Sequence, residues 1–251
     1  MIPFKDHNPT ERFPFVTVVL IAVNLAIFGL LGRTGTGDIE LAFTYEHAAI
    51  PCELVTGRPL TNAEVVRTSN GDGRACEDQS SVFGGSNASA FPGKNVMLAV
   101  LSSMFLHADL IHLLGNMLFL WVFGNNIEDR LGHVMFLLFY VLAGLAATAA
   151  HVAVQPDSTV PIIGASGAIA GVMGAYLVLF PNVPIRSLVF IFITDVPAKF
   201  LLGFWFVLQF FTSPDSGVAW VAHVAGFAFG ALVAFVFRDR LRSPPAPRTA
   251  Y

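Results

Sequence analysis

Four neutral hydrogen-bonding side chains lie inside long apolar stretches of this chain, and their types suit nucleophilic chemistry. They are His112, Asn116, Ser166 and His223. Polar groups within stretches long enough to cross a bilayer are costly, so each one is by default a functional hypothesis. A serine beside a histidine can be activated as a nucleophile, and histidine and asparagine can donate hydrogen bonds to a developing oxyanion. Carboxylates are nearly absent from the same stretches, which disfavours a proton relay built on Asp or Glu.

Ser166 stands in the sequence Gly164-Ala165-Ser166-Gly167, at the start of an apolar stretch and shortly after Pro161. This position predicts the N-terminus of a helix, where unpaired backbone N–H groups and the positive end of the helix dipole could stabilise an oxyanion. The alternative is that the hydroxyl only caps the helix. The pattern is not the nucleophile elbow of soluble hydrolases, because position 168 is alanine and no strand is predicted before it.

His223 shares one face of the last apolar stretch with Gly226 and Gly230, which follow it by three and seven residues. Gly167 and Gly171 give the Ser166 stretch a similar small-residue side. Two such surfaces allow two helix backbones to approach closely, and so predict a hydrogen bond between the serine and the histidine. The alternative is that the glycines serve packing alone and that the histidine is a buried polar contact.

His112 and Asn116 are four residues apart, which places them on one face of a helix where both could donate to an anion. Alternatively, they could only join helices. His107 precedes His112 by five residues, an off-face spacing, and no HExxH motif occurs, so a zinc mechanism is disfavoured. The Gly71 and Asp72 pair lies in a polar region without an intramembrane partner, which disfavours an aspartyl mechanism.

The composition indicates lipid as the main solvent of these elements. Of the 251 residues, 55% are hydrophobic and only 12% are charged, whereas a soluble domain carries roughly a quarter. The net charge is −3 and no basic run is interleaved with aromatics, which excludes nucleic acid as a partner. Apolar stretches near the length of a membrane span predict six transmembrane helices within Phe13–Gly32, Leu110–Ile127, Leu131–Pro156, Ser158–Ile185, Val196–Thr212 and Ser216–Phe237.

Six spans place both chain ends on one side of the membrane. Nine of the 14 basic residues fall on that side: Lys5, Arg12, Arg130, Arg186, Lys199, Arg238, Arg240, Arg242 and Arg248. Positive charge in short segments marks the cytoplasmic side, so we expect a cytoplasmic N-terminus (residues 1–12) and a disordered cytoplasmic tail (residues 238–251), in a bacterial-type plasma membrane. The first span lacks a small-residue cleavage site and is expected to be a retained helix rather than a signal peptide.

Residues 33–94 form a long polar insertion between the first two spans, on the predicted outer side. It contains the chain's two cysteines, Cys52 and Cys76, 24 residues apart. An oxidising compartment would permit a disulfide there, and two free thiols are the alternative. Two apolar segments are too short to cross: Val96–Leu106, expected to be re-entrant or surface-lying, and Ser187–Thr194, expected at the membrane interface.

Taken together, the motifs resemble the rhomboid family of intramembrane serine proteases. The matching pieces are HADLIHLLGNM at His107–Met117, FGNNIEDRLG at Phe123–Gly132, GASGAIAGVMGA at Gly164–Ala175 and AHVAGFAFG at Ala222–Gly230. The resemblance covers most of the chain from about Ser102 onward. It implies an all-α bundle of six transmembrane helices (residues 13–237), with Ser166 as nucleophile, His223 as general base and then acid, and His112 and Asn116 as oxyanion donors.

The same resemblance implies substrates that are membrane proteins whose transmembrane helices unwind near a small residue. No cofactor and no metal are expected. Because lipid cannot supply the hydrolytic water, a cavity open to the outer face is expected, with a lid in the loop Phe211–Trp220. The insertion is longer than expected in a minimal family member, and the Trp-Arg pair of some relatives is absent from it. Two other classes of membrane protein are the alternatives. A transporter would need ionisable groups near the midplane, and an inactive rhomboid-like binding protein would lack the serine or the histidine, which are both present.

Overall fold

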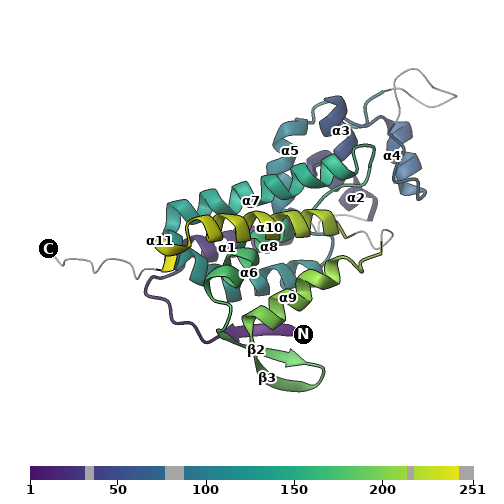
Figure 1. The fold of residues 1–251 in the computed structure, drawn as a ribbon. Coiled ribbons are helices and arrows are strands. Elements are labelled where there is room, and N and C mark those ends of the chain that lie inside the picture. Colours follow the sequence, from purple (N-terminus) through teal and green to yellow (C-terminus); the bar gives the residue numbers. More distant parts are fainter. Residues whose placement is uncertain (32–36, 77–87, 214–217, 243–251) are drawn as a thin grey trace.

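The computed structural model of the chain describes residues 1–31, 37–76, 88–213 and 218–242. Figure 1 shows a body of helices with a smaller group of helices projecting from one end. Six helices of the body follow the six predicted apolar stretches in order: α1 (Phe15–Leu31), α6 (Leu110–Leu131), α7 (His133–Val154), α8 (Ser166–Leu179), α9 (Ala198–Gln209) and α10 (Trp220–Val236). The prediction of a mainly helical protein is confirmed.

A small antiparallel sheet corrects the expectation that the fold is all-α. Its strands are β1 (Ile2–Asp6), β2 (Pro184–Val189) and β3 (Phe192–Pro197), with β2 in the middle. The β2–β3 hairpin occupies the segment expected to lie at the membrane interface. Its two-residue turn places Phe190 at a φ of 54° and leaves Phe190 and Ile191 exposed. Sequence reasoning missed the strands because periodicity alone cannot separate a short apolar strand from a helical segment.

Five of the six helices are shorter than the predicted spans, whereas α6 extends four residues beyond its predicted end at Ile127. Among the described residues, α6 and α7 are long and apolar enough to cross a bilayer by themselves, whereas α1, α8, α9 and α10 are apolar but shorter. The largest difference is in the stretch Ser158–Ile185, where only 14 residues form α8. A loop precedes this helix, and β2 begins at Pro184, so apolar composition overstated its helical length.

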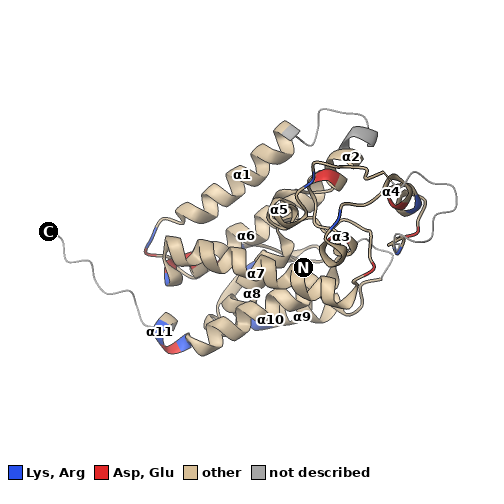
Figure 2. Ribbon diagram, turned by 90° about the horizontal axis from the view of Figure 1, so that it is seen from above, with Lys and Arg blue, Asp and Glu red and all other residues tan. Residues whose placement is uncertain are grey.

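Helix α8 lies at the centre of the body, and Figure 2 shows it between α7 and α10. Every residue from Gly167 to Tyr176 is buried. A helix that is apolar around its whole circumference is typically a buried one. The helix that begins at Ser166 is therefore held from several sides at once, by α6, α7, α9 and α10.

The glycines predicted to serve packing lie where backbones touch. A Cβ atom added to Gly226 would overlap the carbonyl oxygen of Gly167, and one added to Gly230 would overlap that of Gly171. The vacant side-chain positions of Gly167 and Gly171 face Ala147 and Ala143 of α7, at 2.6–2.7 Å from a built Cβ to the alanine Cβ. The glycines of α10 thus admit the backbone of α8, and those of α8 admit α7.

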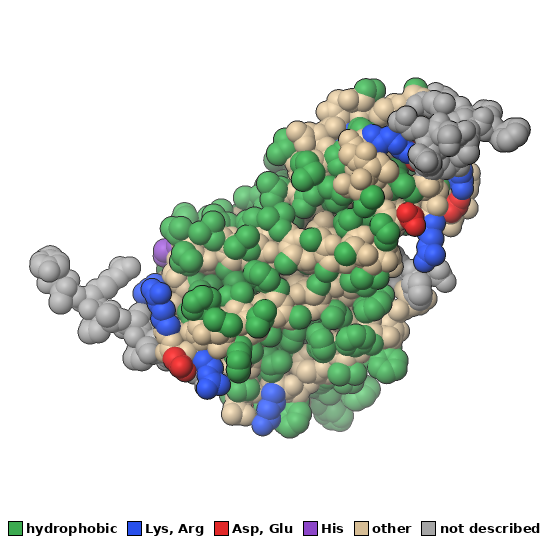
Figure 3. Space-filling model, turned by 45° about the horizontal axis from the view of Figure 1, so that its top comes forward, with side chains coloured by type: hydrophobic (Ala, Val, Ile, Leu, Met, Phe, Trp, Pro, Cys, Tyr) green, Lys and Arg blue, Asp and Glu red, His purple; other side chains and the backbone are tan. Residues whose placement is uncertain are grey.

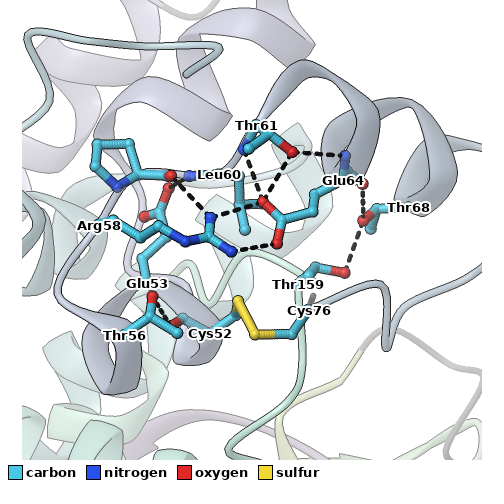
Figure 4. A network of polar contacts seen from close by, with 11 residues as sticks. Cys52, Glu53, Thr56, Arg58, Leu60, Thr61, Glu64, Thr68, Cys76 and Thr159 are labelled. Atoms are coloured by element: carbon cyan, nitrogen blue, oxygen red, sulfur yellow. Dashed lines mark hydrogen bonds and ion pairs between the residues drawn. A yellow bond between two sulfur atoms is a disulfide. The ribbon is translucent and has the colours of Figure 1, made fainter. Parts of the chain in front are cut away.

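The described part of the polar insertion contains the short helices α2 (Gly37–His47), α3 (Pro51–Thr56) and α4 (Asn62–Ser69), and α5 (Val96–Ser102) follows the insertion. Cys52 and Cys76 form a disulfide in it, with their Cα atoms 5.7 Å apart. Figure 4 shows the polar network around this bond, in which Arg58 donates two hydrogen bonds of 2.8 Å to the carboxylate of Glu64. Thr61 and Glu64 form a capping box, a local sequence signature of a helix N-terminus, at the start of α4.

The insertion is hydrogen-bonded to the loop that leads into α8. The Cys52 N–H donates to the Ser158 carbonyl at 2.9 Å, and the Ile162 N–H donates to the Ala49 carbonyl at 2.8 Å. Thr159 makes two further hydrogen bonds to the insertion. Its N–H donates to the Gly73 carbonyl, and its hydroxyl accepts from the Thr68 hydroxyl. These contacts fix residues 158–162, a few residues before Ser166.

At the opposite end of the body, buried carboxylates bind the N-terminal segment. Glu128 of α6 accepts hydrogen bonds from the backbone of Val16 and Thr17, and Asp129 accepts from the backbone of Glu11 and Arg12. At the other chain end, a short helix, α11 (Arg238–Arg242), begins the segment predicted to be a disordered tail, and its remainder lies outside the described residues. In Figure 2 the charged residues lie mainly toward the two ends of the ribbon, and Figure 3 shows hydrophobic side chains over the middle of the face that it presents.

Candidate active site

Ser166 is the first residue of α8, as the sequence predicted for the N-terminus of a helix. Gly164, two residues earlier, has a φ of 114°, a conformation that side chains other than glycine rarely adopt. A Cβ at Gly164 would also lie 2.8 Å from His112 Nε2 and 3.5 Å from Ser166 Oγ. Glycine is thus required here both for the turn into the helix and for the space beside the serine.

The structure brings Ser166 and His223 together from α8 and α10. Ser166 Oγ lies 2.8 Å from His223 Nε2, which is hydrogen-bonding distance. The close approach of the two helices at Gly167 and Gly226, one and three residues further along the chain, makes this distance possible. Serine and histidine therefore have the geometry of a nucleophile and its base.

His112 and Asn116 reach the same place from α6. Both line a cavity of about 870 Å³ that also contains Ser166 and His223. The Asn116 side chain is buried, and its Nδ2 has no hydrogen-bond partner among the residues that the structure describes. A buried amide donor without a partner is costly and calls for an explanation, such as a ligand that it binds. Asp109 caps α6 by accepting from the His112 N–H at 2.8 Å and so fixes the start of that helix.

The rest of the cavity is mainly apolar. Its lining includes Ile162 and Ile163 from the loop held by the insertion, together with Phe119, Met173 and Trp205. An apolar cleft with a few convergent polar groups is the common form of a binding site. The predicted lid, Phe211–Trp220, contributes Val218 and Ala219 to the cavity, whereas its central residues 214–217 lie outside the described residues.

Two neighbours of His223 were not predicted. Gln209 Oε1 lies 2.8 Å from His223 Nδ1, and the Trp205 ring lies beside the imidazole with 5.8 Å between ring centroids. Both belong to α9. The signal for Gln209 was present in the sequence, because it is a neutral polar residue inside an apolar stretch, like the four residues that were singled out.

Residues able to hold a metal do not gather in this cavity in the part of the chain that the structure describes. His107 and His112 are adjacent, with ring centroids 5.0 Å apart, but neither groups with a third ligand. Among the described residues, a cluster of ligand-type side chains occurs instead in the insertion, where Cys52, Glu64 and Cys76 lie together. Its two sulfurs are joined in the disulfide and its carboxylate pairs with Arg58, so these atoms are engaged with one another.

Comparison with known families gives the class of the protein. The model of the rhomboid domain matches residues 94–240, which is more than half of the chain. The chain belongs to the rhomboid family, whose members are embedded in membranes. The matched region covers α5 through α10 and so contains Ser166, His223, His112 and Asn116.

Individual relatives come from bacteria and from mitochondria. "Rhomboid protein 1, mitochondrial" of Saccharomyces cerevisiae is 32% identical over 142 residues, which is 53% of this chain and 33% of the relative. "Putative rhomboid protease YdcA" of Bacillus subtilis is 33% identical over 55% of this chain and 65% of the relative. "Rhomboid protease GlpG" of Serratia proteamaculans is 31% identical over 53% of this chain and 46% of the relative. The alignments thus span between a third and two thirds of these relatives.

Proposed function

We propose that this protein is an intramembrane serine endopeptidase that cleaves membrane-protein substrates with a dyad of Ser166 and His223. The observation that carries the proposal is the 2.8 Å contact between Ser166 Oγ and His223 Nε2, at the start of α8 and inside the cavity. A base within hydrogen-bonding reach is what activates a serine hydroxyl. The names of two relatives, which include the word protease, support the same class of reaction.

In the proposed first half of the reaction, His223 Nε2 takes the proton of Ser166 Oγ while Oγ bonds to the scissile carbonyl carbon. The carbonyl electrons move onto oxygen and give a tetrahedral oxyanion. When the carbonyl re-forms, the C–N bond breaks and the amine leaves with the proton from His223. Water then attacks the acyl-enzyme with His223 again as base, the C–O bond to Ser166 breaks, and the proton returns to Oγ. The only co-reactant is water.

Three donors are proposed to bind the oxyanion: Asn116 Nδ2, the His112 side chain and the Ser166 backbone N–H. The unpaired state of Asn116 Nδ2 supports this role, because an oxyanion would supply the acceptor that it lacks. The first N–H groups of a helix have no partner within the helix, which supports the role of the Ser166 backbone. Preorganised donors of this kind stabilise the transition state without the cost of reorienting solvent.

We further propose that α1 and α6 to α10 are all embedded in the bilayer, with both chain ends on the inner side. The 14 residues of α8 give a length of about 21 Å at ~1.5 Å per residue, less than the ~30 Å hydrocarbon core. If the far end of α8 lies near the inner surface, Ser166 lies below the outer surface and the cavity must admit water to it. The mitochondrial relatives make an organelle membrane the alternative to the bacterial plasma membrane expected from the sequence.

The substrate class follows from the cavity. Apolar residues such as Phe119, Ile163 and Met173 surround the dyad, which supports binding of an apolar segment in extended form. Ile162 and Ile163 belong to a loop whose backbone is already paired with Ala49 of the insertion. We expect substrates to be transmembrane proteins with a small residue at the cleaved bond, because the space beside Gly164 and Ser166 is confined.

The test is covalent labelling by an alkyl fluorophosphonate of the purified protein in detergent. We expect wild-type protein to be labelled at one site and Ser166→Ala not to be labelled, with equal thermal stability. Labelling that persists in Ser166→Ala, or cleavage that a chelator abolishes, would contradict the serine mechanism. A stable wild-type protein that is neither labelled nor active on any membrane-anchored substrate would instead favour a rhomboid-like binding protein.

A further inference from the structure

Behind His223, on the side away from Ser166, lies a polar residue to which the proposed serine mechanism gives no role. Gln209 ends α9, and its side chain is buried against α10, with 8% of the residue exposed. A buried amide must satisfy an oxygen acceptor and two N–H donors, so its orientation carries information about its neighbours. Its two described partners are the Trp205 carbonyl and the imidazole of His223.

The Trp205 carbonyl fixes which way the amide points. Gln209 Nε2 lies 3.0 Å from that carbonyl oxygen, which can only accept a hydrogen bond. Reversing the amide would place two acceptor oxygens against each other. Gln209 Oε1 is therefore the atom that faces His223 Nδ1, at 2.8 Å.

An acceptor at this position selects the tautomer of His223. Neutral imidazole carries one proton, and the ring nitrogen that faces an acceptor is the one that keeps it. With the proton on Nδ1, the Nε2 lone pair faces Ser166 Oγ, which is the form able to accept the hydroxyl proton. The opposite tautomer would turn an N–H toward the serine and leave Gln209 Oε1 facing a lone pair.

We propose that Gln209 is a positioning residue that holds His223 in its base-competent tautomer and orientation, acting through the chain Trp205 carbonyl, Gln209, His223 and Ser166. This inference rests on the proposed serine mechanism. It gives the dyad a neutral third member in place of a carboxylate, which suits a site where a buried charge would be costly. The Trp205 ring, tilted by 38° beside the imidazole, limits rotation of His223 from the same helix.

The experiment compares Gln209→Met, which has a similar shape but no acceptor, with Gln209→Glu, which keeps an acceptor oxygen. The rate of fluorophosphonate labelling is measured against pH, beside thermal unfolding. In Ser-His-Asp proteases, losing the tautomer-fixing acceptor lowers kcat by about 10,000-fold. An amide carries no charge, so we expect a smaller loss in Gln209→Met, on the order of 10- to 100-fold at the pH optimum.

We expect Gln209→Glu to label within about threefold of wild type at its optimum, with the acid limb of its profile moved to higher pH, because a carboxylate favours protonated His223. His112 and His151 also interact electrostatically with His223. Both are unchanged in wild type and in the Gln209 variants, so they do not account for a difference between the pH profiles. The matched control is Leu208→Met, at the adjacent and exposed position, which should label at the wild-type rate.

Two results would overturn the role of Gln209. One is wild-type labelling by Gln209→Met. The other is an equal loss in Gln209→Met and Gln209→Glu, which would mean that the side chain serves packing rather than acceptance. Ser166→Ala separates these failures from failure of the serine mechanism itself, because labelling that survives in Ser166→Ala removes the nucleophile whereas the results above leave it in place.

Discussion

The contact between α8 and α10 and the polar insertion hold adjacent stretches of backbone, on either side of Ser166, by opposite means. At the helix contact, glycines let carbonyl oxygens of α8 lie directly against α10, and shape alone fixes the distance. In the insertion, a disulfide, a capping box, the half-buried pair of Arg58 with Glu64 and the buried pair of Lys94 with Glu53 fix the chain. Ser166 lies between the two, since α10 holds its helix and the insertion holds the loop that precedes it.

The two regions also differ in how polar groups are satisfied. Glu64 of the insertion accepts from Arg58 and from Thr61, and Lys94 donates to two backbone carbonyls. In the body, several buried side-chain atoms have no partner among the described residues, and Asn116 Nδ2 is the one of them that lies in the cavity with the dyad. The charged groups of the insertion therefore serve stability, whereas Asn116 Nδ2 is available to a ligand. This difference predicts which variants lose activity and which lose stability.

The largest effect should come from adding one methyl group at the helix contact. In Gly230→Ala and Gly226→Ala, the new Cβ would overlap a carbonyl oxygen of α8, which is backbone and cannot rotate away. We expect α8 and α10 to separate, at a cost of roughly 1–3 kcal/mol or more. Cleavage and labelling should fall below detection, because the Ser166 to His223 distance depends on this contact.

The matched control for these variants is Gly203→Ala on α9, where an added Cβ has no atom within 4 Å. An alanine in a helix interior is about 0.5–1 kcal/mol more stable than a glycine, so this variant should unfold at the same or a higher temperature and stay active. Thermal unfolding beside activity decides the point. A fully active Gly230→Ala would mean that the helices approach less closely than the structure has them.

The next largest effect should be Asn116→Ala, which sharpens the contrast in polar groups. Losing one oxyanion donor costs about 100- to 1000-fold in turnover, and less when other donors remain. Stability should hold or rise, because the variant removes a buried donor that has no partner. Turnover and unfolding temperature are measured on the same preparation, with Glu64→Ala as the converse case. Wild-type turnover in Asn116→Ala would remove this side chain from the site.

The sequence predicted the positions of the helices and the candidate site better than the connections. Ser166, His223, His112 and Asn116 stand out because polar residues are rare in apolar stretches, and the structure gathers all four around one cavity. Their catalytic roles stay predictions. Gln209 was missed although the same rule applied to it. Its partner is 14 residues away on another helix, and only tertiary contact reveals that pairing.

Elements that depend on pairing between distant segments could not be predicted. Strand β2 pairs with the chain's first residues, Ile2 to Asp6, more than 170 residues away. Nothing in the composition of the insertion indicated that Ala49 and Cys52 bind the loop before Ser166. Hydrophobic length fixed where helices occur but overstated α8, because an apolar loop and strand flank it.

A smaller effect is expected from removing the disulfide. For cysteines 24 residues apart, the chain-closure model gives a stabilisation of roughly 3 kcal/mol, confined to the insertion. In Cys52→Ser/Cys76→Ser, residues 158–162 should exchange amide hydrogens faster, since Cys52 N–H binds Ser158. Turnover should fall only a few-fold, because α10 still holds α8. Reductant should reproduce both effects in wild type and change nothing in the double variant, and a reductant effect there would contradict this assignment.

The smallest effect should be an acid sensitivity of the insertion that originates at Glu64. Burial alone would raise the pKa of Glu64, but hydrogen bonds from Arg58 and Thr61 outweigh it and hold the pKa below the ordinary value of 4.5. The unfolded insertion then binds a proton more readily than the folded one, so Glu64 contributes stability above pH 4.5 that is lost as the pH falls through its lowered pKa. Glu53 shifts in the opposite direction, because burial raises its pKa despite the nearby Lys94.

The contributions of Glu64 and Glu53 are separated by following local hydrogen exchange in wild type and in Glu64→Gln from neutral pH downward. Wild type should be the more protected at neutral pH, and the difference should shrink below pH 4.5. A difference in protection that does not depend on pH would mean that Arg58 and Glu64 act through shape and hydrogen bonding rather than through the charge of Glu64. The insertion would then differ less from the uncharged contact between α8 and α10 than the structure indicates.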